Sequence, residues 1–110
     1  MYQYKAKLLN VVDGDTVDMA IDLGFYVTMK HRLRLYGINT PELNSSDLTE
    51  RALAVQAKQF VLDTLAIGET YVIDTYKDDK YGRLLAEIWV DGAMLNKQLL
   101  INGFAKEYIK

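Results

Sequence analysis

The sequence of 110 residues has no cysteine, one histidine and one proline. The absence of cysteine excludes a disulfide framework, a thiol nucleophile, and zinc or iron–sulfur sites with cysteine ligands. One histidine, His31, excludes a His-rich metal site and leaves a single candidate for any Ser-His-Asp arrangement. No stretch approaches the ~18 consecutive apolar residues of a transmembrane helix. The start, MYQYKAKLLN, lacks the apolar centre of a signal peptide.

The chain also lacks an excess of positive charge, with 13 Lys and Arg against 15 Asp and Glu. The formal net charge is −2 and the pI is about 5.3, which disfavours a protein that coats nucleic acid, since such proteins are strongly basic. An enzyme that meets one phosphate is compatible with this balance, because a bound cation and a few arginines can reverse the potential locally. The hydrophobic content of 50% predicts a single domain over residues 1–110.

Alternating apolar residues and turn signals predict three strands, a helix, two more strands and a short second helix. A small mainly-β fold with helices packed outside follows, and a five-stranded oligonucleotide/oligosaccharide-binding (OB-fold) barrel fits this order. The expected strands cover 4–12, 15–21, 25–38, 70–76 and 84–90, and the short helix covers 94–100.

Two details of these elements matter for the site. A turn is expected at Asp22–Gly24, so that Arg32 and Arg34 lie on one face of the following strand, opposite His31. The first helix is expected to begin at Ser45, Ser46 or Asp47 as its N-cap. Its sheet-facing stripe is predicted to contain Leu48, Ala52, Val55, Gln59 and Leu62.

Three segments carry residues suited to metal-assisted phosphodiester chemistry. They are VVDGDTV at 11–17, RLRLYGINTPE at 32–42 and DDKYGR at 78–83. In the first, Asp13 and Asp15 share a face of the chain. For an isolated Asp-Gly-Asp, however, a hairpin turn with solvated acids is the more common explanation. An EF-hand does not fit, because its sixth position requires glycine and here is Asp18.

The other two segments supply the remaining groups. Pro41 favours an extended Thr40, whose carbonyl can then act as a metal ligand. Glu42 could activate water, and Arg83 offers paired donors to phosphate oxygens. Each segment also has an ordinary structural explanation as a solvated strand face, a helix entry or a polar turn. The combination is what indicates a function.

Together the three motifs resemble the staphylococcal nuclease (thermonuclease) family, in the same order and at similar separations, from about Lys5 to Lys106. The resemblance implies an OB-fold barrel and calcium-dependent hydrolysis of DNA and RNA that leaves 3′-phosphates. It assigns the metal ligands to Asp15, Asn39 and the Thr40 carbonyl, with Asp13 nearby. It assigns catalysis to Arg34, Glu42 and Arg83, and substrate binding to Lys80, Tyr81 and Tyr108.

The chain departs from the family at two points. Asn39 stands where familiar members have aspartate, which predicts weaker calcium binding because affinity depends on ligand charge. The chain is also shorter at its C-terminus, where familiar members continue into a third helix, so that Tyr108 is the one tyrosine available there.

The sequence is also compatible with two other functions. One is a catalytically weak copy of the barrel that binds nucleic acid or protein, and the other is a calcium-binding structural domain. The expected partners are DNA or RNA and no membrane, with the chain a monomer or weak dimer. Its compartment is open: a cytoplasmic bacterial, phage or plasmid product, or the mature domain of a secreted precursor.

Overall fold

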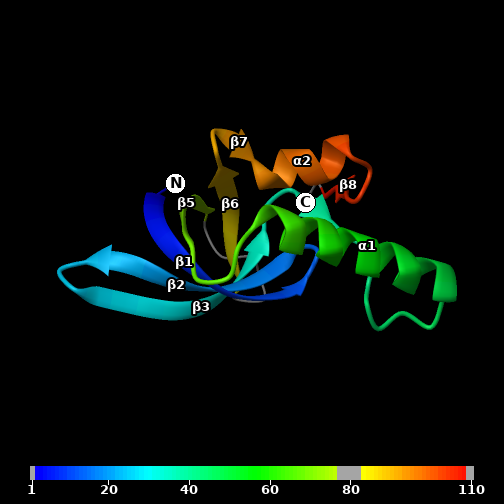
Figure 1. Cartoon of the computed structure of the whole chain (residues 1–110), viewed down its shortest axis with the longest axis horizontal. Coiled ribbons are helices and arrows are strands. Elements are labelled where there is room, and N and C mark those ends of the chain that lie inside the picture. The colour runs from blue at the N-terminus through cyan, green and yellow to red at the C-terminus, as the bar shows by residue number, and fades with distance from the viewer. Residues whose placement is uncertain (1, 77–82, 109–110) are drawn as a thin grey trace.

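A computed structural model describes residues 2–76 and 83–108, and it shows a closed barrel with two helices on its outside (Figure 1). The elements in chain order are β1 (Tyr2–Asp13), β2 (Thr16–Gly24), β3 (Val27–Leu35), β4 (Ile38–Asn39), α1 (Leu48–Thr64), β5 (Thr70–Tyr76), β6 (Leu84–Val90), β7 (Ala93–Met94), α2 (Leu95–Ile101) and β8 (Lys106–Glu107).

Five of these strands form the barrel. β1 pairs with β2 and β5, β2 pairs with β3, and β5 pairs with β6, all in the antiparallel sense. A short parallel pairing of β3 with β6, which sets Leu33 beside Leu84 and Arg34 beside Leu85, closes the barrel. The predicted OB-fold architecture is therefore confirmed, and the bounds of β5 and β6 are those expected from the sequence.

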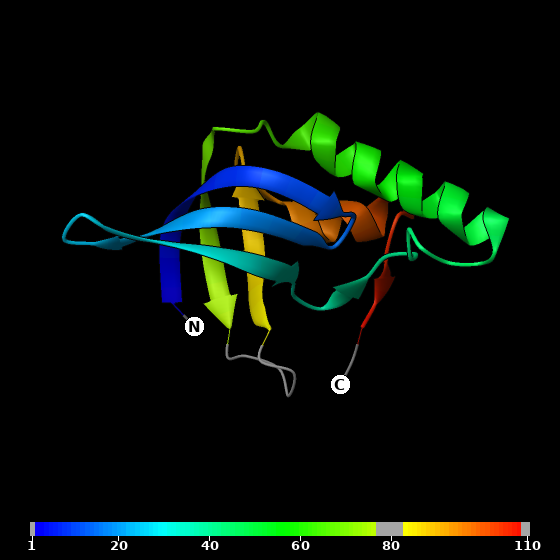
Figure 2. The same cartoon turned by 90° about the horizontal axis from the view of Figure 1, so that it is seen from below.

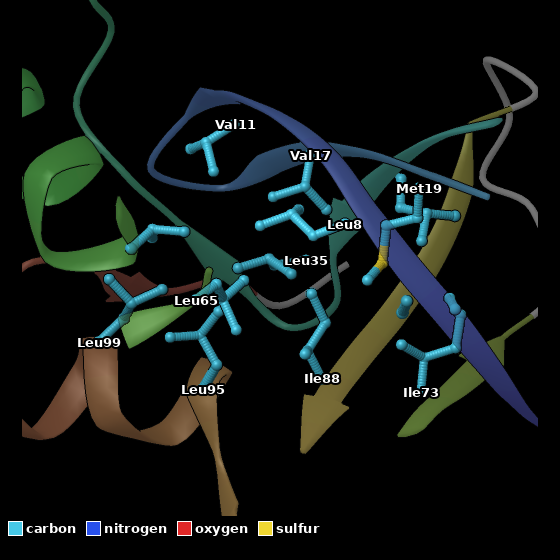
Figure 3. Close-up of a cluster of buried hydrophobic side chains, with 14 of the residues drawn as sticks. Leu8, Val11, Val17, Met19, Leu35, Leu65, Ile73, Ile88, Leu95 and Leu99 are labelled. Atoms are coloured by element: carbon cyan, nitrogen blue, oxygen red, sulfur yellow. The ribbon is translucent and has the colours of Figure 1, made fainter. Parts of the chain in front are cut away.

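The core fills the barrel and the space beneath the helices (Figure 3). Alternate residues of β1 and β2 point inward, as the period of two in a strand requires. The largest fully buried side chains of the core include Leu8, Met19, Leu35, Ile88 and Leu99. Burial of this kind stabilises by about 1.5–3 kcal/mol per large aliphatic side chain.

The β2–β3 hairpin extends past the barrel (Figure 2), and its reversal differs from the prediction. The expected turn at Asp22–Gly24 is wrong. Asp22 instead accepts a hydrogen bond from the Gly24 N–H, at a register irregularity within the ladder. The chain reverses at Phe25 and Tyr26, whose φ angles of 53° and 62° place both in the left-handed region.

Helix α1 begins at one of the three predicted caps, since the Asp47 carboxylate accepts from the Thr49 N–H at 2.9 Å. Its predicted sheet-facing stripe is wrong: Leu48, Val55 and Leu62 are exposed, and so are Ala52 and Gln59. The helix is buried through Ala54, Ala57 and Val61. Close packing on the β1–β2 turn admits small side chains there, so the bulky ones face solvent.

The C-terminal part supports the 32–42 segment. β4 pairs with β8, and the Tyr108 N–H donates to the Gly37 carbonyl at 2.9 Å. Asn96 of α2 is buried, donates its side-chain amide to the Tyr36 and Ala86 carbonyls, and accepts from the Ile88 N–H. In the described residues, neither helix is long and apolar enough to cross a membrane.

Candidate functional site

Asp15 is the centre of the candidate site. The residue is 6% exposed and lies just before β2, where the β1–β2 turn meets Thr40, directly after β4. Its Oδ2 accepts from the Arg34 Nη1 and from the Thr40 N–H, both at 3.1 Å, and its Oδ1 accepts from the Thr16 hydroxyl. These contacts join the first two sequence motifs, and the Thr40–Asp15 bond links residues that are 25 positions apart.

Arg34 links Asp15 to Asn39. Besides Asp15, its guanidinium donates to the Asn39 Oδ1 at 2.7 Å and to the Ile38 carbonyl at 3.2 Å. Its side chain is only 12% exposed, and the Tyr108 ring centroid lies 5.4 Å from its Cζ. Three hydrogen bonds and one aromatic face therefore hold the guanidinium in a fixed orientation.

Gly14 is required by the close approach of three elements. A Cβ at this position would meet Ala57 Cβ at 2.8 Å and Thr40 side-chain atoms at 3.0 and 3.1 Å. No residue larger than glycine fits without displacing α1 or the loop after β4. Thr40 Oγ1, packed against Gly14, is a buried polar atom without a hydrogen-bond partner among the described residues.

The two acids of the first motif differ in environment. Burial raises the pKa of Asp13 to about 6, and the neighbouring Asp15 carboxylate adds to the rise. Burial alone would also raise the pKa of Asp15, but hydrogen bonds with Asp13 and Thr40, with the charge of Arg34, hold it below its usual value. Asp15 is thus kept ionised, while Asp13 keeps its proton to a higher pH than an ordinary aspartate does because its pKa is raised.

Glu42 lies beside this network at the edge of a cavity of about 690 Å³. Its carboxylate is on an exposed residue, and its backbone N–H donates to the Glu50 carboxylate at 3.3 Å. The cavity is also lined by Asn39, Thr40 and Tyr108, so the predicted base, two predicted ligands and one predicted substrate contact share it. Its volume is in the range of small-molecule binding sites.

The third motif is only partly described. Arg83 is exposed and directly precedes β6, whose residue Leu85 pairs with Arg34. The register therefore brings Arg83 to the same end of the barrel as Arg34. The predicted substrate contacts Lys80 and Tyr81 lie outside the described residues.

Three residues were missed by the sequence analysis. Thr16 donates to Asp15, Ile38 accepts from Arg34 through its carbonyl, and Glu50 holds the backbone of Glu42. A threonine next to an aspartate could have been noticed, but a backbone carbonyl and a helix glutamate eight positions away carry no local signal. The rings of Tyr36 and Tyr76, which the sequence analysis did not pair, stack with their centroids 4.1 Å apart.

The oxygen atoms gathered here fit a hard divalent cation. Asp15 contributes a buried carboxylate, Asp13 a second one, and Asn39 an amide oxygen held at the same guanidinium as Asp15. Carboxylate, amide and carbonyl oxygens are the ligands that Ca²⁺ takes. Over the described residues, no group of three or more His, Cys, Asp or Glu side chains is placed to hold a metal ion. The set with Asn39 has one charge fewer than a set with a carboxylate at that position.

The family described as Staphylococcal nuclease homologue matches residues 32–110. A thermonuclease of Staphylococcus hyicus is 29% identical over 101 residues, which is 91% of this chain and 57% of that protein. An uncharacterized protein of Methanocaldococcus jannaschii is 30% identical over 129 residues. That match covers 96% of this chain and 60% of the archaeal protein.

A third relative, named as a probable staphylococcal-like nuclease of Oryza sativa subsp. japonica, is 32% identical over 79 residues. That match covers 72% of this chain and 22% of the plant protein. The chain therefore spans less than two thirds of the length of all three relatives.

Proposed function

Because the chain belongs to the staphylococcal nuclease family, we propose that it is a calcium-dependent phosphodiesterase that hydrolyses DNA and RNA with little sequence specificity and leaves 3′-phosphates. The observation that carries the proposal is the hydrogen-bonded unit of Asp15, Arg34, Asn39 and Thr40 beside the cavity that Glu42 lines. These are the groups to which the proposal assigns the roles of oxygen ligands, phosphate-binding cation and general base.

Arg34 is suited to the developing charge of the reaction. Attack on a phosphodiester places added negative charge on the non-bridging oxygens, where an oriented guanidinium stabilises it. The bonds to Asp15, Asn39 and the Ile38 carbonyl hold Arg34 in place before a substrate arrives, so little reorganisation is needed. We assign Arg83, at the same end of the barrel, to the same phosphate.

Glu42 is the proposed general base. Its exposed position on the rim of the cavity lets it accept a proton from an attacking water, and a positioned carboxylate contributes about 10²–10⁴-fold. Asp13, Asp15, Asn39 and the Thr40 carbonyl are the proposed calcium ligands. Bound Ca²⁺ would polarise the phosphoryl oxygens as a Lewis acid.

The proposal is tested by incubating plasmid DNA and single-stranded RNA with the protein in calcium and in excess chelator. We expect cleavage in calcium and none in chelator. Arg34→Ala and Glu42→Gln should each lose at least about 100-fold in rate. Arg32→Ala is the matched control for Arg34→Ala, because Arg32 lies on the same strand but pairs with Asp18 outside the site.

Near-wild-type turnover in a folded Arg34→Ala protein would refute the assigned roles. Binding of either substrate without cleavage would instead favour the catalytically weak binding module.

A further inference from the structure

The tip of the β2–β3 hairpin presents two aromatic side chains to solvent. Phe25 is 97% exposed and Tyr26 is fully exposed, with Leu23 and Val27 half-exposed beside them. Figures 1 and 2 both show this tip projecting beyond the barrel, away from α1 and the C-terminal segment. Large exposed apolar groups on a projection commonly mark an interaction site.

Folding does not account for these residues. A two-residue hairpin loop with positive φ at both positions suits Asn-Gly or Asp-Gly, whereas bulky side chains are strained there. Neither ring is buried in the protein. The chain thus carries backbone strain at Phe25 and Tyr26 with no gain in packing, and strain of this kind is a pointer to function.

The sheet face leading to the tip is basic, although the whole chain has a net charge of −2. Outward-facing positions alternate with the buried Ala6, Met19 and Ile21. Cross-strand register sets Lys7 beside Ala20 and Ala20 beside Lys30. Arg32 is paired with Asp18. Nearer the tip, three lysines against one carboxylate give a formal charge of +2; they are Lys5, Lys7 and Lys30 against Asp22.

A shallow hollow of about 700 Å³ lies between this face and the tip. Small residues, Ala20, Gly24 and Thr28, form part of its lining. Two cations, Lys5 and Lys7, line it together with one carboxylate, Asp22. Phe25 and Tyr26 line it as well. The hollow therefore combines ring faces, positive charge and space within one concave surface.

We propose that this hollow and the hairpin tip form a second nucleic-acid contact, which binds an unpaired segment of the strand held at the candidate site. Bases stack on Phe25 and Tyr26, and the lysines attract the phosphates. Stacking on aromatic side chains beside a cationic groove is how single strands are bound without sequence preference. This inference rests on the proposed function and extends it to the mode of substrate binding.

The two sites are continuous along the same strands. Thr16 pairs with Arg34 at the candidate site, and Gly24 pairs with Val27 at the tip. Seven residues of β3 separate them, or roughly 23 Å at the rise of a strand. About seven nucleotides span that length at the 3.4 Å rise of a fully stacked strand, and an extended strand needs fewer, so a chain of 15 nucleotides can occupy both.

The test uses Phe25→Asn combined with Tyr26→Gly, which removes both rings and installs the residues that this turn prefers, so the fold is retained. Fluorescence anisotropy in chelator and low salt measures binding of a labelled 15-nucleotide single strand and of the matching 15-base-pair duplex. We expect the double variant to bind the single strand at least about tenfold more weakly. Duplex affinity should change less than about threefold, because paired bases cannot stack on the tip.

A matched control replaces two other exposed apolar residues, both on α1, in the variant Val55→Asn with Leu62→Asn. This variant should bind the single strand as the wild type does. Lys7→Gln with Lys30→Gln should weaken single strand and duplex alike and lower the salt dependence. Equal single-strand binding by the wild type and the tip variant, or no binding by the wild type, would overturn the inference.

A further outcome would also overturn it: loss of binding to anionic phospholipid vesicles in the tip variant while single-strand binding is kept, which would assign the tip to a lipid surface. Failure of the proposed nuclease activity is separate, since it would be seen as absence of cleavage by the wild type in calcium, whatever the tip binds.

Discussion

At the scale of single residues, Asn39 is the position where this site differs in charge from an all-carboxylate set. Its side-chain oxygen lies 2.7 Å from the Arg34 Nη2 and carries no formal charge. An amide oxygen can ligate calcium, but with a smaller electrostatic contribution than a carboxylate.

Asn39→Asp is therefore expected to tighten calcium binding about tenfold, which is about 1.4 kcal/mol. Isothermal titration calorimetry measures the affinity directly. Asn44→Asp adds the same charge at an exposed position of the following loop and should leave the affinity unchanged. Unchanged or weaker binding by Asn39→Asp would contradict the ligand assignment.

Tyr76 has a separate, measurable signature. Its hydroxyl donates to the Glu87 carboxylate, and this bond, followed by burial, raises its pKa from 10.0 to about 12. The folded chain then keeps a proton that the unfolded chain loses, so stability should fall as pH rises from about 10 to 12.

An ultraviolet titration of the phenol groups should show a last step near pH 12 that disappears in Tyr76→Phe. Tyr2→Phe, at a largely exposed tyrosine, should retain that step. A titration of Tyr76→Phe that still ends near pH 12 would show that the assignment is wrong.

At the scale of elements, the site depends on how closely α1 packs on the β1–β2 turn. Gly14 lies under Ala57 of α1 and against Thr40, so one glycine sets the separation of the helix from two of the motifs. This contact also explains why α1 is buried through small residues rather than through its leucines.

Gly14→Ala should destabilise the fold by about 1–3 kcal/mol, as overpacking does. Ala57→Gly removes the nearest atom, so the double variant should lose less stability than the two single losses combined, as measured by denaturant unfolding. Ala52→Gly loses the same helix propensity at an exposed position of α1. Its effect on stability should therefore be additive with that of Gly14→Ala. Additive losses for the Ala57 pair would contradict the contact.

At the scale of the whole molecule, calcium binding and folding are linked. The proposed ligands come from the β1–β2 turn and from β4 with the loop after it, so an unfolded chain cannot hold them together. A cation that binds only the folded state stabilises it by mass action.

Calcium at 100 times its dissociation constant should add about 2.7 kcal/mol, which raises the melting temperature by about 10 °C or more for a domain of this size. Differential scanning calorimetry with and without calcium measures this shift. Asp15→Asn should melt at the same temperature in both. Equal shifts in the two proteins would place the cation elsewhere.

The sequence by itself determined the strand order, the helix positions and the three motifs. These depend on local properties. The β-rich composition of 70–76 and 84–90 predicts the observed bounds of β5 and β6. Asp47 is among three candidate caps because a short acidic side chain can accept from a helix N–H. The candidate site residues were likewise identified by type and order along the chain.

Only the tertiary structure decided how these residues meet. The Arg34 bridge between Asp15 and Asn39, the support of Glu42 by Glu50, and the outward face of α1 all depend on contacts across the fold. The turn at Phe25 and Tyr26 escaped prediction because strand register, rather than local turn preference, sets where the chain reverses. Long-range packing has no signature in a short stretch of sequence, so these features required the fold.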